Sequence, residues 1–362
     1  MCTSITSPDA GADRGFGSRS VTEIVLPGAV EPDGLQVRRS APREPGRGQG
    51  LVAVEATGVS FAEQQMRRGK YYDQPPFPFV PGYDLVGTVT AVGPGTDPAL
   101  VGRRVAALTK IGAWASAVVL DVDDLVAVPD GVDPAEAEAV VVNGITAWQL
   151  LHRIARVGKG ATVLVLGANG GVGTTLLQLA RDAGVRVIGT ASPRHHDTVR
   201  ALGAIPLDYR DPQLSARVRE LAPAGVDAVF DHVGGPGIVE SFRLLARGGT
   251  LVAYGTAATR DDVGSSRLPV LALIARLLWW NALPNGRRTH FFNIWAGRRN
   301  RAAFRARLAE DLGKVFDLLR EGRIQAQVAA RLPLHDAAAA MRLAESGTVA
   351  GKVVLIPGRA TS

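Results

Sequence analysis

One stretch of the chain restricts the fold more than any other: residues 161–192 read ATVLVLGANGGVGTTLLQLARDAGVRVIGTAS. Residues 161–166 are a short apolar run rich in β-branched side chains, which predicts a strand buried on both faces. A glycine-rich turn follows, and residues 174–183 carry apolar side chains at helical spacing up to Gly184, a normal helix end. A second strand is predicted at residues 185–188. Together these pieces form a βαβ unit, the building block of a parallel α/β sheet.

The turn inside this unit has the context of a dinucleotide-binding fingerprint. In that fingerprint, glycines let the backbone approach a pyrophosphate, and amides at the helix N-terminus point at its charge. Ala168 stands at the first glycine of the G-x-G-x-x-G pattern, so the surrounding strand–turn–helix–strand order carries the prediction. The alternative is a glycine turn in an α/β protein that binds no nucleotide. The residues assigned to the pyrophosphate are Ala168, Gly170, Gly171, Val172 and Gly173.

Composition limits the remaining possibilities. A length of 362 residues suggests about two domains, and 46% hydrophobic residues are enough for large cores. The only cysteine is Cys2, which excludes a disulfide within the chain and a cysteine zinc cluster and predicts a reducing, cytoplasmic location. Residues 1–20 are polar and glycine-rich, so we expect a loose tail there and see no signal peptide. The net charge of +7 comes mostly from scattered arginines, which predicts a modest anionic ligand rather than nucleic acid.

The chain before the βαβ unit predicts an antiparallel β module. Strands are expected at residues 21–26, 35–39 and 50–58, with Gly/Pro turns between them. A short helix is expected to end at Gly69, and further strands follow up to residue 120. A helix is expected to begin at Pro134, because proline is tolerated in the first helical turn.

Seven segments now occur together in a fixed order: VPGYDLVGTVTAVGPG, VGRRV, VVNGITAWQLL, VLVLGANGGVGTTLLQLA, VFDHVGG, GGTLVAYG and GTVAGKVVLIP. As a set they resemble the medium-chain dehydrogenase/reductase superfamily, and most of all its zinc-independent quinone oxidoreductase branch, including the vesicle amine transport protein-like members. The resemblance implies an α/β fold with a GroES-like β domain plus a Rossmann domain, a doubly wound parallel sheet. The implied divisions are a flexible tail over residues 1–20, a GroES-like substrate domain over 21–142, a Rossmann NADP-binding domain over 143–319 and a return to the GroES-like domain over 320–362.

Zinc is not expected. Zinc-dependent members of the superfamily use a cysteine and a GHE segment, and the corresponding places here are Ser60 and Gly82-Tyr83-Asp84. A catalytic zinc site needs about three protein ligands of the Cys, His or carboxylate type. The six histidines are not placed to supply them.

The end of the second βαβ strand indicates the cofactor. NAD enzymes usually carry an acid there for the ribose 2′-hydroxyl, but this chain has Ser192 and Arg194, which suit the 2′-phosphate of NADP(H). In the resembling enzymes a lysine stands where His195 falls and a tyrosine where Tyr209 falls, and both hold the 2′-phosphate. His195 is therefore a departure from the family pattern. The alternative for Arg194 is a cap on a surface loop.

Other cofactor contacts are expected from the ends of later strands. Ligands of open α/β sheets bind outside the carboxyl ends of the strands. The resemblance places Thr146 against the nicotinamide, although a helix threonine often only bonds back to a carbonyl. For His232 the expected role is a ribose-side contact or packing, with catalysis as the weaker alternative. The remaining assigned residues are Tyr254, Gly255, Thr256, Phe292 and Asn293.

Two residues are assigned to the acceptor. The resembling quinone reductases carry a cleft tyrosine where Tyr71 falls, so Tyr71 is expected to orient the acceptor carbonyl or donate a proton, with water as the alternative donor. Ser60 stands at the family's usual asparagine, and a second cleft tyrosine of some relatives falls on Gln65. The polar side chains of the cleft therefore differ from those of the resembling enzymes.

The segment VLALIARLLWW at residues 270–280 is too short to span a bilayer and contains Arg276. We expect a helix that covers the cleft or a subunit interface, with a membrane-surface helix as the alternative. Residues 288–294 are strand-like, and in the family this strand lies at the sheet edge where two subunits join. The resemblance therefore implies a homodimer through residues 288–294.

Two classes of function remain. The first is an NADPH-dependent oxidoreductase that transfers a hydride to a quinone or an activated alkene. The second is a low-turnover NADPH-binding protein with a structural or membrane-associated role. A biosynthetic tailoring reductase of an unsaturated intermediate differs from the first in substrate and shares its chemistry.

Overall fold

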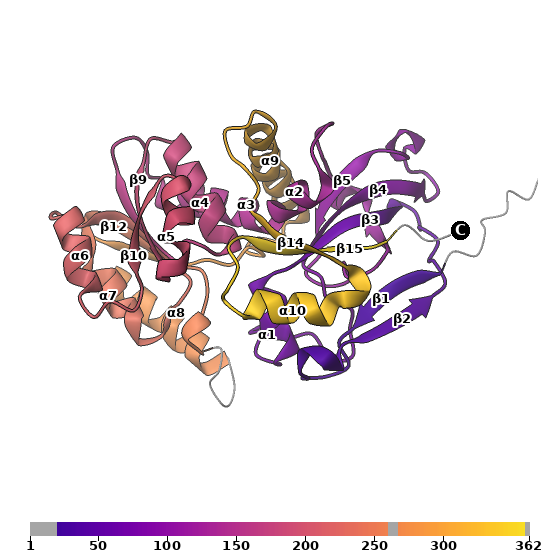
Figure 1. The fold of residues 1–362 in the computed structure, drawn as a ribbon. Coiled ribbons are helices and arrows are strands. Elements are labelled where there is room, and N and C mark those ends of the chain that lie inside the picture. The colour runs from indigo at the N-terminus through magenta and orange to yellow at the C-terminus, as the bar shows by residue number, and fades with distance from the viewer. Residues whose placement is uncertain (1–19, 260–266, 359–362) are drawn as a thin grey trace, which may run out of the picture.

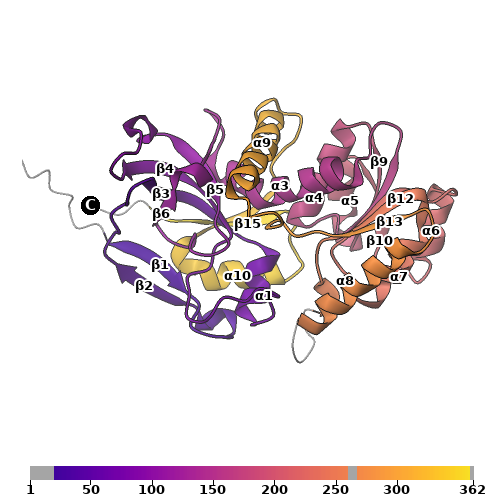
Figure 2. The same cartoon turned by 180° about the vertical axis from the view of Figure 1, so that it is seen from behind.

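The computed structural model describes residues 20–259 and 267–358, so the tail expected over residues 1–20 lies outside the described residues except for Ser20. The described chain forms two lobes side by side, each built on its own large sheet (Figure 1). Helix α3 (Val141–Trp148) lies where the lobes meet. In both views α9 (Arg301–Arg320) lies above this junction and α10 (Ala337–Glu345) below it (Figures 1 and 2).

The first lobe contains a seven-stranded sheet in the order β14-β15-β3-β4-β5-β7, with β6 also paired to β3, and a separate β1–β2 ribbon. Burial alternates along β3, as expected for a strand with one face on the core. The strands are β1 (Val21–Val25), β2 (Gln36–Ser40), β3 (Gln49–Val59), β4 (Asp84–Val92), β5 (Arg104–Leu108), β6 (Ala117–Asp121), β7 (Val126–Ala127), β14 (Val328–Pro333) and β15 (Lys352–Ile356). Because β15 runs antiparallel to β3, the end of the chain completes the sheet begun near its start.

The second lobe contains a six-stranded parallel sheet in the order β10-β9-β8-β11-β12-β13. This is the strand order of a doubly wound dinucleotide fold. The strands are β8 (Thr162–Leu166), β9 (Arg186–Ala191), β10 (Ala204–Asp208), β11 (Val226–Asp231), β12 (Leu245–Ala253) and β13 (Arg288–Phe291). Its helices are α4 (Gly171–Asp182), α5 (His196–Ala201), α6 (Leu214–Leu221), α7 (Ile238–Arg243) and α8 (Arg267–Ala282).

The apolar run of β8 is continuous because helices cover both faces of the sheet. Val163 and Val165 pack into the core cluster that contains Leu176 of α4, whereas Leu164 packs into a second cluster with Ile238 of α7. Neighbouring side chains of a strand point to opposite faces, so each face needs its own apolar partners.

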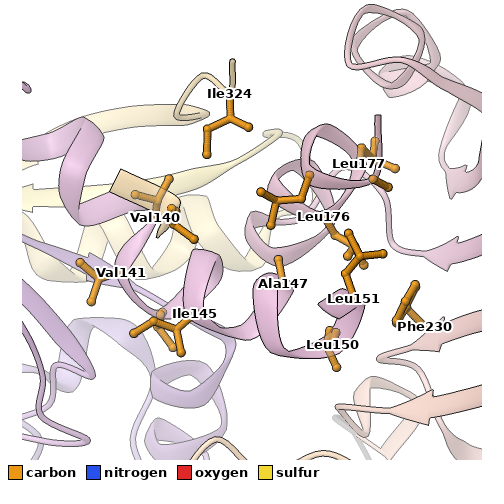
Figure 3. Close-up of a cluster of buried hydrophobic side chains, with 14 of the residues drawn as sticks. Val140, Val141, Ile145, Ala147, Leu150, Leu151, Leu176, Leu177, Phe230 and Ile324 are labelled. Atoms are coloured by element: carbon orange, nitrogen blue, oxygen red, sulfur yellow. The ribbon is translucent and has the colours of Figure 1, made fainter. Parts of the chain in front are cut away.

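One core cluster extends through both lobes. It includes Val86 from the first sheet and Phe230 from the second, and α3 supplies much of the material between them. Figure 3 shows this junction with side chains of α3 and its flanks close to those of α4. The labelled side chains are Val140, Val141, Ile145, Ala147, Leu150, Leu151, Leu176, Leu177, Phe230 and Ile324. Packing through α3 fixes the relative position of the lobes, and with it the walls of any site between them.

Several element boundaries differ from the sequence prediction. The last of the strands expected up to residue 120 is β6, which begins only at Ala117, because the chain still turns at Gly112, where φ is 102°. Helix α10 is preceded by a 3₁₀ turn at Leu334–Asp336. Helix α4 begins at Gly171, three residues before the apolar periodicity starts. The remaining helices are α1 (Phe61–Arg67) and α2 (Pro134–Ala139). Across residues 20–259 and 267–358, no helix is long and apolar enough to cross a membrane.

Candidate active site

A cavity of about 430 Å³ lies between the lobes. Its walls come from the start of α1, the loop after Gly69, α3, the glycine turn, and the carboxyl ends of β11, β12 and β13. The assigned residues that line it are Ser60, Tyr71, Thr146, Gly170, Gly171, Val172, Gly173, His232, Tyr254, Gly255, Thr256, Phe292 and Asn293. The structure therefore brings most of the assigned residues to one place. Those that do not line the cavity are Ala168, Ser192, Arg194, His195 and Tyr209.

The glycine turn is shaped by close approaches that leave no room for side chains. A Cβ on Gly173 would lie 2.3 Å from the carbonyl oxygen of Gly167, and one on Gly171 would lie 2.5 Å from the Asn143 amide. Ala168 is fully buried, and its methyl group faces Gly189 of β9, where a Cβ would lie 2.8 Å away. The glycine at 189 therefore makes room for an alanine at the first position of the fingerprint.

The start of α4 offers backbone amides to the cavity wall. Gly170, Gly171, Val172 and Gly173 all line the cavity, and the first amides of a helix have no acceptor within the helix. A Cβ on Gly170 would meet nothing closer than 3.4 Å, so the turn is open on this side. An open turn followed by a helix N-terminus fits a diphosphate.

His232 is held as a neutral ring. Its Nδ1 lies 3.0 Å from the carbonyl oxygen of Leu166 at the end of β8, and burial lowers its pKa although Asp231 acts against this. A neutral ring that donates from Nδ1 keeps Nε2 as an acceptor. Asp231 itself accepts backbone N–H groups from Val233 and Gly234 at 2.8 Å each, which shapes the loop. The geometry suits a contact to a hydroxyl-bearing ligand.

The residues assigned to a 2′-phosphate lie beyond the cavity, at the ends of β9 and β10. Ser192 and Arg194 follow β9, and Tyr209 follows β10. Arg194 is exposed, whereas His195 is only 6% exposed and its Nε2 lies 3.2 Å from the carbonyl oxygen of Gly347. The ring of His195 is therefore turned toward the protein.

At the other end of the cavity, two phenols form a pair. The hydroxyl oxygens of Tyr71 and Tyr83 lie 2.9 Å apart, and the indole N–H of Trp295 donates to Tyr83. Burial raises the pKa of both phenols, so both stay protonated near neutral pH. The neighbouring Tyr72 donates to Asn293 at 3.2 Å. These phenols are hydroxyl donors at the cavity wall, and the carbonyl oxygen of a bound substrate could accept a hydrogen bond there.

Ser60 and Gln65 add polar atoms to the same end. Both residues line the cavity, and the Ser60 Oγ and the Gln65 Nε2 are buried without a hydrogen-bond partner among the described residues. A buried polar atom without a partner is costly. These atoms are candidates for contacts to a bound molecule.

A buried ion cluster adjoins the cavity, and its lysine, Lys352, lines the wall. The Nζ of Lys352 lies 2.7 Å from Asp84 Oδ2 and 2.7 Å from Glu138 Oε1. Burial lowers the pKa of Lys352, but the two carboxylates outweigh it and raise the pKa overall. Burial and the charge of Asp84 raise the pKa of Glu138 well above its ordinary range. Nearby, burial and Asp84 raise the pKa of Glu63 to about 7, with Lys352 acting in the opposite direction.

One member of this cluster, Asp84, comes from the Gly82-Tyr83-Asp84 segment that was compared with the zinc-binding GHE segment. Asp84 accepts from Lys352 and, at 2.9 Å, from the backbone N–H of Val142. Within the ranges that the structure describes, no group of three or more His, Cys, Asp or Glu residues could hold a metal ion.

Sequence reasoning missed Tyr83 and Lys352 as parts of the site. Tyr83 was considered only as a replaced zinc ligand, and its aromatic neighbour Trp295 is 212 residues away. Lys352 stands within the GTVAGKVVLIP segment, where a lysine at the start of a buried strand was the available signal.

Comparison with known proteins agrees with this geometry. A family described as "Alcohol dehydrogenase GroES-like domain" matches residues 46–130, and "Zinc-binding dehydrogenase" matches residues 202–355. The rat synaptic vesicle membrane protein VAT-1 homolog is 33% identical over 339 residues, which covers 90% of this chain and 80% of that protein. A Mycobacterium tuberculosis mycocerosic acid synthase-like polyketide synthase is 32% identical over 86% of this chain and 14% of its own length.

Solved structures show the same fold. A mycobacterial protein complexed with NADPH has a TM-score of 0.79 and 32% identity, covering 93% of this chain and 100% of that chain. The Escherichia coli quinone oxidoreductase complexed with NADPH has a TM-score of 0.80 and 26% identity, with the same coverage.

The two-lobed fold, the glycine turn and these matches define an oxidoreductase-type α/β protein with a GroES-like lobe and a Rossmann lobe, which confirms the predicted fold class. The chain belongs to the medium-chain dehydrogenase/reductase superfamily, in its quinone oxidoreductase and VAT-1-like branch.

Proposed function

We propose that this protein is a zinc-independent, NADPH-dependent oxidoreductase that transfers a hydride to a quinone or an activated alkene. The observation that carries the proposal is the cavity between the lobes, which has a diphosphate-type helix N-terminus on one wall and protonated phenols on another. Two similar solved structures were determined with NADPH, and this supports the choice of cofactor.

Different residues of the chain bind different parts of the cofactor. The α4 N-terminus takes the diphosphate, Thr146 and Asn293 line the wall for the nicotinamide, and Ser192 and Arg194 take the 2′-phosphate. The bound cofactor supplies the hydride. The chain then mainly holds donor and acceptor together, which can lower a barrier by about 7–11 kcal/mol.

A conjugated acceptor fits the hydrogen-bond donors of the cavity better than a simple ketone does. Conjugation spreads the charge left by hydride addition, so hydrogen bonds from Tyr71 and Ser60 are sufficient support. Tyr71 is positioned to orient the acceptor carbonyl or to donate a proton to the product. We expect rapid NADPH oxidation with quinones or enones and poor NADP-dependent oxidation of simple alcohols.

Two measurements test the proposal. The first follows NADPH and NADH oxidation over a panel of quinones, enones and enoyl thioesters, with NADPH expected to be favoured more than tenfold in kcat/KM. Arg194→Glu should narrow or reverse that preference. The second is metal analysis, in which stoichiometric zinc required for activity would contradict the proposed independence of zinc. Equal use of both cofactors by the parent protein would contradict the choice of NADPH.

A second candidate function is a low-turnover NADPH-binding protein that associates with a membrane or a partner. The exposed apolar side chains of α8 favour it: Leu268, Leu271, Leu278 and Trp279 are 60–70% exposed. Tight NADPH binding without turnover of any acceptor would support this candidate. A biosynthetic reductase is instead supported if enoyl thioesters are the best acceptors.

We also propose a homodimer through residues 288–294 and the adjoining face of α8. β13 is an edge strand of the parallel sheet, and α8 packs beside it. The exposed apolar face of α8 next to this strand is a surface that proteins usually cover.

A further inference from the structure

The ends of β9 and β10 form a small exposed platform next to the proposed 2′-phosphate position. The two strands are parallel neighbours, and Ala191 at the end of β9 is in register with Asp208 at the end of β10. The residues that follow, Ser192 to Arg194 on one strand and Tyr209 and Arg210 on the other, therefore leave the sheet side by side.

Arg210 is organised on this platform by its neighbour. Its guanidinium carbon lies 5.1 Å from the centre of the Tyr209 ring, and its Nε donates to the Tyr209 hydroxyl at 3.0 Å. Tyr209 is 51% exposed, so the pair stands at the surface. A guanidinium has five N–H donors, and this contact uses one of them. The tyrosine hydroxyl accepts from Arg210, which leaves its own proton free to donate.

The two nearby carboxylates each have a hydrogen-bond or ion-pair partner other than the Arg210 guanidinium. Asp208 accepts the backbone N–H of Arg210 at 3.0 Å, and Asp197 on α5 is paired with Arg200. The platform therefore combines hydroxyl and guanidinium donors, the chemistry that binds a phosphate dianion.

His195 does not supply the cation that a lysine would bring to this position. The ring is 6% exposed and directed at the carbonyl oxygen of Gly347. Arg194 alone carries one charge, whereas a phosphate monoester carries nearly two at neutral pH. A second cation from the neighbouring strand end would balance that charge.

We propose that Arg210, stacked on Tyr209, is the second cation that binds the 2′-phosphate of NADP(H), and that it takes over the role of the residue at 195. This assignment rests on the proposed function, since it concerns the cofactor of the same site. Arg210 is thus a determinant of cofactor specificity rather than a catalytic residue.

The test measures dissociation constants of NADPH and NADH by protein fluorescence for the parent, Arg210→Ala and Arg210→Lys. Arg210→Ala should weaken NADPH binding by about 10- to 100-fold, as expected for loss of a charged hydrogen-bond donor, and leave NADH within about twofold. Arg210→Lys should fall between, because an ammonium can neither stack nor form a fork. The matched control is Arg219→Ala, an exposed arginine on α6 that should change neither constant.

The possible outcomes distinguish failure of the Arg210 assignment from failure of the proposed function on which it rests. If the parent prefers NADPH, two results would overturn the role of Arg210 and leave the proposed function in place. One is that Arg210→Ala weakens the binding of NADPH and NADH equally, and the other is that Arg210→Ala binds NADPH as tightly as the parent does. A parent that binds neither cofactor, or prefers NADH, would overturn the proposed function and this inference with it. Thermal unfolding midpoints within experimental error of the parent show that any change in binding is local.

Discussion

The hydroxyl oxygen of Tyr71 lies 2.9 Å from that of Tyr83, on the wall of the cavity between the lobes. Trp295 can only donate, so the Tyr83 oxygen accepts from it, while either phenol can donate across the Tyr71–Tyr83 contact. When Tyr83 donates to Tyr71, the Tyr71 proton can point at a bound acceptor.

Tyr71→Phe should therefore lower turnover by about 10- to 100-fold if Tyr71 is the proton donor, within the usual range for general acid catalysis. The solvent isotope effect on turnover should change with it. Tyr72→Phe is the comparison variant, because its phenol lies on the same wall but donates to Asn293, and it should lower turnover less than Tyr71→Phe. A Tyr71→Phe variant as fast as the parent, with the same isotope effect, would identify water as the donor.

The raised pKa of Glu63 should appear as a dependence of stability on pH. Its pKa is about 7 in the folded chain and near 4.5 when exposed. Between these values the folded state binds a proton that the unfolded state has lost, so stability falls as pH rises from 4.5 to 7. The loss is about 1.4 kcal/mol per pH unit within that window.

Glu63→Gln should flatten this slope relative to the parent. Urea unfolding at several pH values between 4.5 and 8 measures it, and the difference between variant and parent cancels groups common to both, such as Glu138. Gln keeps one acceptor for the backbone N–H groups of Ser60 and Tyr83, so some stability should be lost at every pH. Parallel curves for the two proteins would show that Glu63 titrates normally.

Lys352→Met should destabilise the fold by about 3–5 kcal/mol, because Asp84 and Glu138 would remain buried without their cation. Urea unfolding at neutral pH measures the loss. Adding Glu138→Gln should recover part of it. Arg331→Met is the control, since its ion pair with Asp133 is half-exposed and should be worth at most about 1 kcal/mol. A Lys352→Met variant as stable as the parent would show that the cluster is not an ion pair in solution.

Self-association through the β13 edge should depend more on side chains than on backbone pairing. Asn281 already bonds both the N–H and the carbonyl of Thr289, at 2.7 and 2.8 Å, and Asn285 accepts the N–H of Arg287. These contacts occupy outward backbone groups of the edge. The apolar face of α8 is left to be covered.

We therefore expect Leu278→Glu to convert a micromolar dimer to monomer in light scattering, and Phe291→Pro to weaken it less. Val37→Glu is the control, because Val37 is an exposed apolar residue of β2 in the other lobe. A monomeric parent at micromolar concentration would rule out the dimer. A dimer that survives both substitutions in the second lobe would place the interface elsewhere.

The sequence was sufficient to predict those features that depend on the pattern of neighbouring residues. The βαβ unit at residues 161–192 was identified because strand burial, turn glycines and helix periodicity are read from neighbouring residues. The order of seven motifs then indicated the superfamily and the two-lobe fold. The start of α4 was not identified, since the helix begins at Gly171 within the glycine turn, before the apolar periodicity begins.

The relationships that decide the site came only from the tertiary structure. Lys352 meets Asp84 across 268 residues, and Trp295 reaches Tyr83 across 212. The His195 ring points at the carbonyl oxygen of Gly347, whereas Arg210 lies at the surface against Tyr209. From the sequence alone, both side chains were equally suitable for binding a phosphate. Periodicity reports which face of an element is buried, but not which distant element covers it. That choice is made when the two lobes pack around α3, and only then do these side chains acquire partners.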